Sequence, residues 1–249
     1  MRKIILIGGS GILGKFYAKK LSVNNEIHVA DVGLKDSQPS KNRYNYFLDI
    51  QNEKKVSEFF QKIKKNKGTF DILINNAAFT TEMALKDSRT KKKDFFSTKI
   101  WDQTINTNLK GSFLACKYFI KYHHSKKIDQ RVINIGTIYG LHSPHHKIYD
   151  DQKFFSSISY SSSKAGLIGM TRWLATKFAT EKTSFNMISP AGVFNKHNKK
   201  FLKDYISLIP QKKMASEKQI FAAIEFLISK NADYVIGQNI FVDGGFSAW

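Results

Sequence analysis

Short apolar, β-rich runs alternate with helical patterns along the whole chain, and this alternation restricts the fold more than any other feature of the sequence. The runs that predict strands are 3–7, 26–30, 44–48, 71–74, 131–135, 184–188 and 239–242. The patterns that predict helices between them are 11–21, 53–65, 99–123, 158–179 and 216–228. Because parallel strands need a crossover connection, and that connection is usually a helix, we expect an α/β fold with a doubly wound, mostly parallel sheet of about seven strands.

The 249 residues contain no internal repeat and no linker, so we expect a single domain over residues 1–249. Two stretches depart from the alternation. The first, about 141–157, is rich in histidine and polar residues, and the second, about 193–210, is basic. We call them the insert and the lid. Ligands of a doubly wound sheet bind beyond the carboxyl ends of its strands, so we expect both stretches to border a substrate site.

The charge balance limits the partners that the chain could have. Forty lysines and arginines against twenty aspartates and glutamates give a formal net charge of +20 at pH 7. A field of this sign favours anionic small molecules, acidic proteins or nucleic acid. The lysines are scattered, however, with the densest run at Lys91-Lys92-Lys93, and no basic run is interleaved with aromatics in a nucleic-acid-binding module. We interpret them as a solvated surface and expect no nucleic-acid partner.

Membrane and secretory signals are not found in the sequence. No run approaches the ~18 uninterrupted apolar residues of a membrane span. The amino terminus passes from a short apolar run into a glycine turn without a signal-peptide cleavage site. The single Cys116 cannot form an internal disulfide. We therefore expect a cytoplasmic protein that does not bind membranes.

A glycine-rich turn follows the first predicted strand and opens the first helix. Glycines at 8, 11 and 14 permit a tight turn, close backbone approach to a pyrophosphate, and close packing of the helix. The amino terminus of that helix supplies N–H groups and a partial positive charge for the phosphates. This context predicts a Rossmann-type dinucleotide site whose first contacts are Gly8, Ser10, Gly11, Ile12, Leu13 and Gly14.

Asp31, at the end of the second predicted strand, bears on the choice of dinucleotide. A carboxylate there can accept both ribose hydroxyls of NAD and would repel the 2′-phosphate of NADP. The alternative interpretation is a turn aspartate that binds its own backbone. Lys15 and Lys35 would weaken the discrimination. We expect NAD as the cofactor, with NADP as the alternative.

Tyr160 and Lys164 lie four residues apart on the predicted helix 158–179, and therefore on one face of it. A free tyrosine has a pKa of about 10, which is too high for a base near neutrality. An ammonium held nearby favours the phenolate and lowers that pKa. The spacing is common by chance, so this pair alone does not identify a site.

The pair belongs to an ordered series of motifs that resembles the short-chain dehydrogenase/reductase family over nearly the whole chain. Besides the glycine turn and Asp31, the series comprises Asp49, Asn75-Asn76-Ala77-Ala78, Asn108-Leu109-Lys110-Gly111, Asn134-Ile135-Gly136-Thr137, Pro190-Ala191-Gly192, Gly237-Gln238 and Val242-Asp243-Gly244-Gly245. Four details depart from the family's usual pattern without removing a reacting group: the spacing of the glycines, and the identities of Ala78, Thr137 and Ala191.

The resemblance implies a role for each matching residue. Tyr160 would be the general acid/base, and Lys164 would lower its pKa and hold the nicotinamide ribose. Thr137 would hydrogen-bond the reacting oxygen of the substrate, and Asn108 would hold a water that links Lys164 to bulk solvent. The further expected cofactor contacts are Asp49 and Ile50 at the adenine, Asn76 and Ala77 with the adjoining Asn75 at the adenosine ribose and backbone, and Pro190, Gly192 and Val193 at the nicotinamide carboxamide.

The insert makes the interval between Thr137 and Tyr160 longer than is usual in the family. Its histidines, at 142, 145 and 146, suggest a metal site, but no ligand spacing on a regular element is present and we predict no metal. Together with Phe201 and Tyr205 of the lid, the insert looks like that of the bacterial subgroup associated with flagellin modification and surface-sugar biosynthesis.

We therefore expect an NAD(P)-dependent oxidoreductase that interconverts a secondary alcohol and a ketone, on a phosphorylated or nucleotide-linked sugar in glycan precursor synthesis. One alternative is a 3-oxoacyl-(acyl-carrier-protein) reductase, whose acidic carrier would suit the basic surface, although such enzymes usually prefer NADP. Another is a non-catalytic dinucleotide-sensing protein, which would not need Asn108, Thr137, Tyr160 and Lys164 together.

The resemblance also implies a homodimer or homotetramer that assembles through the helices bearing Asn108 and Tyr160. Four aromatic residues on these helices could serve either the interface or the core: Phe113, Tyr118, Trp173 and Phe178.

Overall fold

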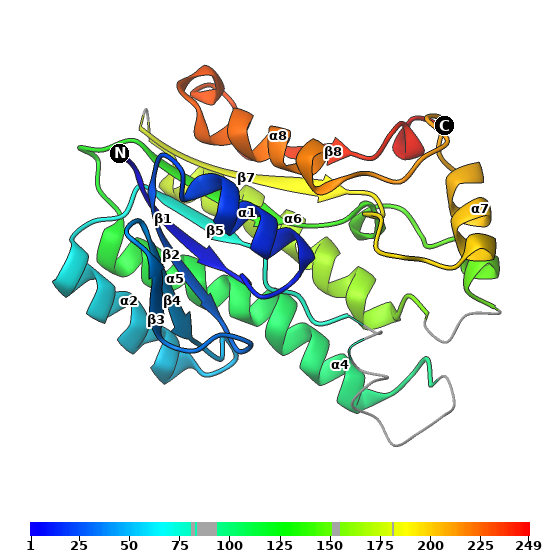
Figure 1. Ribbon diagram of the computed structural model, residues 1–249, viewed down its shortest axis with the longest axis horizontal. Coiled ribbons are helices and arrows are strands. Elements are labelled where there is room, and N and C mark those ends of the chain that lie inside the picture. Colours follow the sequence, from blue (N-terminus) through cyan, green and yellow to red (C-terminus); the bar gives the residue numbers. More distant parts are fainter. Residues whose placement is uncertain (81–82, 84–93, 151–154, 181) are drawn as a thin grey trace.

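The computed structural model describes residues 1–80, 83, 94–150, 155–180 and 182–249, and within them an eight-stranded sheet lies between two layers of helices (Figure 1). The sheet order is β3-β4-β2-β1-β5-β6-β7-β8. The strands are β1 (Lys3–Ile7), β2 (Glu26–Asp31), β3 (Ser37–Ser40), β4 (Arg43–Phe47), β5 (Ile72–Asn75), β6 (Gln130–Ile135), β7 (Thr183–Pro190) and β8 (Asn239–Val242). Every neighbouring pair is parallel except β3 and β4. The predicted doubly wound α/β fold is confirmed.

The strand that the sequence did not predict is β3, at the edge of the sheet beside β4. Its four residues, Ser-Gln-Pro-Ser, are all exposed and contain no apolar side chain. Proline is tolerated at such a position because an edge strand leaves half of its backbone groups unpaired. No hydrophobic alternation could signal this strand.

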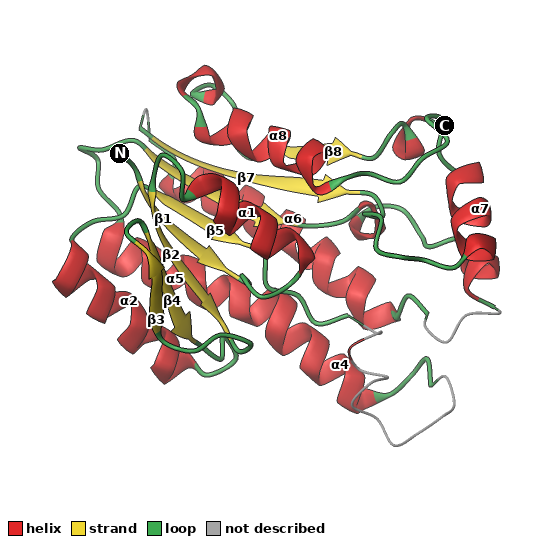
Figure 2. Cartoon of the chain, in the orientation of Figure 1, coloured by secondary structure: helices red, strands yellow, loops and turns green. Residues whose placement is uncertain are grey.

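Helices cover both faces of the sheet, with α1 and α8 on one face and α2, α5 and α6 on the other (Figure 2). The helices are α1 (Ile12–Leu21), α2 (Glu53–Lys67), α4 (Thr98–Ile105), α5 (Ser112–His123), α6 (Ile158–Phe178), α7 (Lys199–Ser207) and α8 (Glu217–Ile228). Side chains of Asn52, Ser97, Ser157 and Asn198 accept backbone N–H groups at the starts of α2, α4, α6 and α7. Within the described ranges, no helix is both long and apolar enough to cross a membrane.

The predicted helix 99–123 is interrupted. A π-helical turn, Asn106–Gly111, separates α4 from α5. Such turns often lie at functional sites, because the extra residue redirects the side chains around it. Here the turn carries Asn108, whose side chain is bound in the interior as described below. The helical periodicity on either side of the turn gives no sign of it.

The core consists of two layers, one on each face of the sheet. Ile4, Ile5, Leu6 and Ile7 of β1 are all buried, alternating between the layer under α1 and α8 and the layer under α2, α5 and α6. Central parallel strands are covered on both faces, so they read as continuous apolar runs. Each such side chain contributes about 1.5–3 kcal/mol on burial. This rigid sheet fixes the positions of the loops that follow its strands.

Candidate active site

The glycine turn after β1 packs tightly against the segment that follows β5. Gly8 has φ +92°, and a Cβ at this position would overlap the backbone nitrogen of Ala77. Asn76 Nδ2 donates to the Gly8 carbonyl at 2.6 Å. A Cβ at Gly14 would likewise overlap the Gly8 carbonyl oxygen, so α1 begins directly against the turn. Asn76 and Ala77 thus fix the shape of the turn.

The open side of this turn fits a dinucleotide pyrophosphate. No atom lies within 4 Å of the position that a Cβ would take at Gly11, and no side chain caps the amino terminus of α1. The first helical residue, Ile12, is 43% exposed, and Ser10 and Leu13 flank it, half-buried. The positive end of the helix dipole is therefore available to an anion.

The Asp31 carboxylate accepts two hydrogen bonds from the glycine turn and one from Gly33, just after β2. Its Oδ2 accepts the Ser10 N–H at 3.0 Å, and its Oδ1 accepts the Ser10 hydroxyl at 2.7 Å and the Gly33 N–H at 2.8 Å. The bond to Gly33 is that of a turn aspartate. The bonds to Ser10 also place a carboxylate beside the open side of the turn. The structure thus shows the turn interpretation, and a role of the same carboxylate in choosing between NAD and NADP stays a prediction.

Three residues expected at the adenosine end have other contacts. Asn75 is 3% exposed, and its Nδ2 donates to Asn134 Oδ1 at 2.8 Å and to Cys116 Sγ at 3.3 Å. The structure therefore places the Asn75 side chain in the core and not in the cofactor site. Ile50 is buried in the core under α2 and α5. Asp49, half-buried, accepts the Gln51 N–H at 3.0 Å just before α2.

The three predicted catalytic side chains converge where β6 ends and α6 begins. Lys164, 2% exposed, donates from Nζ to the Ile135 carbonyl at 2.8 Å, and the same Nζ lies 5.9 Å from the centre of the Tyr160 ring. The hydroxyls of Thr137 and Tyr160 are hydrogen-bonded. Ser157 caps α6 by accepting the Tyr160 N–H at 3.2 Å, which fixes the first turn of the helix.

The protonation of this group differs from the sequence-based expectation. Burial raises the pKa of Tyr160 to about 12, against a smaller opposing effect of the Thr137 hydrogen bond. Burial also lowers the pKa of Lys164 to about 8. In this structure desolvation dominates the pKa of Tyr160 and the Lys164 ammonium is directed at a backbone carbonyl, so the lowering of that pKa by Lys164 stays a prediction. At neutral pH Tyr160 is a protonated phenol, the form that can donate a proton.

Asn108 connects the segment after β5 to the catalytic helix. It is fully buried, and its Oδ1 accepts the Phe79 N–H at 2.7 Å while its Nδ2 donates to the Phe79 carbonyl at 3.2 Å and to Ser163 Oγ at 3.1 Å. Ser163 in turn donates to the Tyr160 carbonyl at 2.8 Å. The sequence did not indicate the role of Ser163. The water proposed at Asn108 stays a prediction.

The segment after β7 presents a backbone edge near the same site. Ala215 N–H donates to the Gly192 carbonyl at 3.1 Å, and Phe194 N–H donates to the Ala215 carbonyl at 3.0 Å. These two bonds bracket Val193 in a parallel bridge, so its own N–H and C=O point away from Ala215. A backbone donor and acceptor side by side could pair with the two halves of a carboxamide, and the nicotinamide contact of residues 190–193 stays a prediction.

The insert and the lid pack on each other beyond the carboxyl ends of β6 and β7. Tyr149 of the insert stacks obliquely on Phe201 of α7, with ring centres 5.5 Å apart. We call the buried group they form the roof cluster: Ile138, Tyr139, Ile148, Tyr149, Ala191, Phe201, Tyr205, Ile209 and Met214. Among the described residues, no three His, Cys, Asp or Glu side chains converge as metal ligands would.

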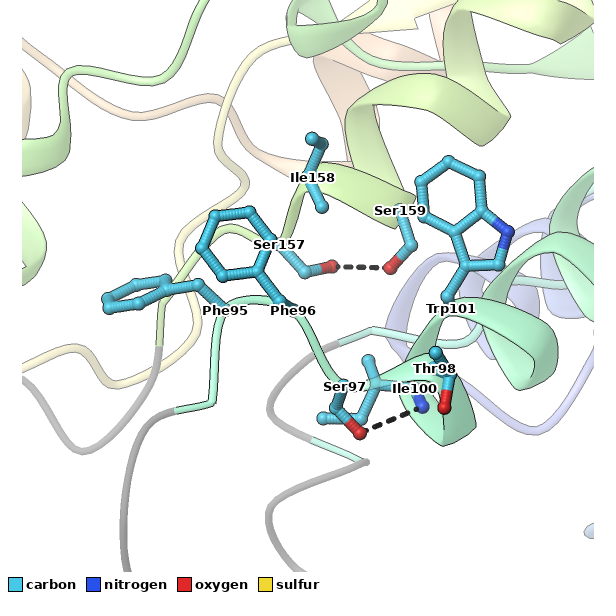
Figure 3. Close-up of a pocket in the computed structure, with 9 residues that line it drawn as sticks. All are labelled: Phe95, Phe96, Ser97, Thr98, Ile100, Trp101, Ser157, Ile158 and Ser159. Carbon is cyan, nitrogen blue, oxygen red and sulfur yellow. Dashed lines mark hydrogen bonds between the residues drawn. The ribbon is translucent and has the colours of Figure 1, made fainter.

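An outward-facing pocket of about 340 Å³ lies at the amino-terminal ends of α4 and α6 (Figure 3). Its walls are mainly apolar, and Ser157, which caps the catalytic helix, forms part of them. The lining residues are Phe95, Phe96, Ser97, Thr98, Ile100, Trp101, Ser157, Ile158 and Ser159. Nothing in the sequence pattern predicted this pocket.

Comparison with known proteins agrees with this geometry. A family model described as enoyl-(acyl carrier protein) reductase matches residues 28–247. The 3-oxoacyl-(acyl-carrier-protein) reductase FabG of Buchnera aphidicola subsp. Baizongia pistaciae is 31% identical, over 98% of this chain and 97% of the relative.

Solved structures extend the likeness to the whole fold. A short-chain dehydrogenase from Leptospira borgpetersenii with bound NAD⁺ has a TM-score of 0.87 at 29% identity, covering 99% of this chain and 92% of that one. ElxO with NADP bound has a TM-score of 0.81 at 26% identity over the full length of both chains. The chain therefore belongs to the short-chain dehydrogenase/reductase family and is an NAD(P)-dependent oxidoreductase.

Proposed function

We propose that this protein reduces the keto group of a 3-oxoacyl thioester to the 3-hydroxyacyl thioester, with NADH as the hydride donor. The observation that carries the proposal is the roof cluster, whose buried aromatic and aliphatic side chains lie beyond the carboxyl ends of β6 and β7, the edge of the sheet that also bears Thr137. An acyl chain gains free energy against such a wall, whereas a sugar needs several polar partners to replace its hydration. Relatives that are 3-oxoacyl-(acyl-carrier-protein) reductases over nearly the whole chain support the same substrate class.

The protonation of the site favours the reductive direction. When bound, the reduced nicotinamide supplies a hydride to the carbonyl carbon. The Tyr160 and Thr137 hydroxyls would bind the carbonyl oxygen, and Tyr160 would transfer its proton to that oxygen as negative charge develops. A pKa of about 12 keeps the phenol protonated until then. The buried Lys164 ammonium stabilises the resulting phenolate.

Asp31 is the reason to propose NADH. Its carboxylate stands at the open side of the glycine turn with Oδ2 accepting one protein bond and Oδ1 two. Since a carboxylate has about four acceptor positions, one remains for a ribose hydroxyl. The same negative charge would repel a 2′-phosphate.

The second candidate substrate is a phosphorylated or nucleotide-linked sugar. The observation that favours it is the outer surface of the lid, where Lys196, Lys199 and Lys203 are exposed. Positive charge there would attract a phosphate, although it would attract an acidic carrier protein equally well.

We also propose that the protein assembles as a homodimer or homotetramer through α4, α5 and α6. Trp101 and Phe113 are exposed on α4 and α5, and Trp173 is exposed on α6, which packs beside α4. A second copy would cover these side chains. Tyr118 lies in the core instead, and Phe178 packs half-buried against it.

A substrate series tests the proposed function. Oxidation of NADH would be followed at 340 nm with acetoacetyl-CoA, longer 3-oxoacyl thioesters, and 4-keto and 3-keto nucleotide sugars. Each added CH₂ that contacts the roof cluster contributes up to about 0.8 kcal/mol, so we expect kcat/KM to rise by about threefold per carbon. Turnover of a keto sugar with no turnover of any thioester would refute the proposal in favour of the second candidate.

A further inference from the structure

Tyr205, a buried residue of the lid, touches the segment expected to hold the nicotinamide. It lies on α7, where Phe201 and Tyr205 form the buried face of the helix. The Gly192 N–H donates to the Tyr205 hydroxyl at 2.6 Å. The ring of Tyr205 also packs directly against Gly192, because a Cβ at Gly192 would lie 2.8 Å from both Cζ and Oη of Tyr205. Only glycine allows the phenol to reach this backbone.

The bond to Tyr205 fixes the peptide unit that leads into the nicotinamide segment. Gly192 uses its N–H on Tyr205 and its carbonyl on Ala215, so both of its backbone polar groups are satisfied on the protein side. The Tyr205 hydroxyl therefore holds the peptide between Ala191 and Gly192, and Ala215 holds the peptide between Gly192 and Val193. Val193 follows with its N–H and C=O directed away from Ala215, so its position depends on both contacts.

The same hydroxyl also contacts the substrate side of the site. Tyr205 is hydrogen-bonded to Tyr139, which follows Thr137 directly after β6, and Tyr139 Oη lies 3.0 Å from Tyr149 Oη of the insert. Burial raises the pKa of all three phenols, so they remain neutral hydrogen-bonding groups. One buried side chain thus joins the lid, the turn after β6 and the backbone after β7.

We propose that Tyr205 is a positioning residue that couples packing of the lid to binding of the nicotinamide. With α7 packed on the site, its hydroxyl holds Gly192 so that Val193 can pair with the carboxamide. With α7 displaced, Gly192 loses this bond, and the Ala191–Gly192 peptide that leads into Val193 is no longer held from the lid. The inference rests on the nicotinamide position proposed above and is independent of the substrate's identity.

The test separates the nicotinamide half of the cofactor from the adenosine half. Dissociation constants would be measured by calorimetry for the reduced dinucleotide that the wild type binds more tightly, NADH or NADPH. The comparison ligand lacks nicotinamide: ADP-ribose for NADH, or 2′-phospho-ADP-ribose for NADPH. The variants are Tyr205→Phe and, as the matched control, Tyr149→Phe, which removes a phenol hydroxyl of the roof cluster that does not contact Gly192.

In Tyr205→Phe the free protein can shift this segment so that water satisfies the Gly192 N–H, and dinucleotide binding must then restore the packed position with the N–H unsatisfied. That penalty is about 1–3 kcal/mol, so we expect the variant to bind the dinucleotide about tenfold more weakly. Binding of the comparison ligand should change by less than about twofold. Tyr149→Phe should leave both constants within about twofold of the wild type. Melting temperatures of all three proteins show whether each variant is folded.

Two kinds of result would overturn the proposal. Tyr205→Phe could bind the dinucleotide as tightly as the wild type, which would show that the hydroxyl does not position the nicotinamide segment. Alternatively, Tyr205→Phe could weaken binding of both ligands equally, or Tyr149→Phe could weaken binding of the dinucleotide as much as Tyr205→Phe does. Either outcome would show general loosening of the fold. Neither result depends on whether a thioester or a sugar is reduced, because no substrate is present.

Discussion

Replacing Asp31 with alanine should shift the cofactor preference from NADH towards NADPH. The carboxylate accepts three hydrogen bonds from the protein, from Ser10 N, Ser10 Oγ and Gly33 N, so about one acceptor position is left for the ribose. Losing a hydrogen bond to a charged group costs NADH about 1.5–3 kcal/mol. Removing the repulsion of a 2′-phosphate at this partly exposed site improves the binding free energy of NADPH by about 1 kcal/mol.

These effects add in the ratio of kcat/KM for NADPH to that for NADH, which should rise by about 10²-fold or more. The loss of the three internal bonds should also lower the melting temperature, but it affects both cofactors alike and cancels in the ratio. The matched control is Asp36→Ala. Asp36 also binds a backbone N–H, that of Phe47 at 2.8 Å, and its removal changes the net charge equally.

The assay is initial-rate oxidation of each cofactor at one fixed substrate concentration, followed at 340 nm. Asp36→Ala should leave the ratio within about twofold of the wild type, because Asp36 does not bind the glycine turn. The reasoning is refuted if the wild type already prefers NADPH, or if Asp31→Ala and Asp36→Ala shift the ratio equally.

Three further predictions address the catalytic group, the glycine turn and the core. Tyr160→Phe should lower kcat by about 10²- to 10⁴-fold and leave the dissociation constant for NADH within a few-fold, measured by stopped flow and calorimetry; activity near the wild-type level would contradict its role as proton donor. Gly8→Ala should abolish NADH binding or prevent folding, since φ is +92° and a Cβ overlaps Ala77; a variant with normal affinity and melting temperature would show that the turn adapts. His123 is buried with its pKa lowered to about 4, so the unfolded chain binds more protons between about pH 4 and 6.5. The unfolding free energy should therefore decrease by up to about 3 kcal/mol as the pH is lowered from 6.5 to 4. Urea titrations at several pH values should show a smaller loss of unfolding free energy for His123→Phe than for the wild type. An equal loss in both proteins would show that groups other than His123 cause the acid sensitivity.

The sequence predicts the framework of this molecule because the framework follows from periodicity. Seven of the strands are signalled by apolar runs, and the glycine turn, Asp31, Thr137, Tyr160 and Lys164 lie where a strand ends or a helix begins. Helix α7 was missed within a segment that reads as basic, although Asn198 and the i, i+4 pair Phe201 and Tyr205 could have indicated it.

Features that depend on three-dimensional packing could not be inferred in this way. The inward direction of Asn75 is set by its register opposite Asn134 on β6, and register is not visible in a strand's own residues. The pKa of Tyr160 depends on desolvation by neighbouring segments, which outweighs the nearby lysine. The hydrogen bond from the Gly192 N–H to Tyr205 joins the segment after β7 to helix α7, and their approach depends on the packing of the roof cluster.

The most direct test of the central claim is a single-turnover reaction with NADH deuterated at the nicotinamide C4 on the transferred face. Wild-type protein, pre-mixed with this NADH, would be combined with acetoacetyl-CoA, and the thioester would be analysed by mass spectrometry. The account predicts one deuterium at C3 of a 3-hydroxybutyryl thioester, and no labelled product on the same timescale from Tyr160→Phe. Oxidation of NADH without label in the thioester, or equal labelling by the Tyr160→Phe variant, would contradict it.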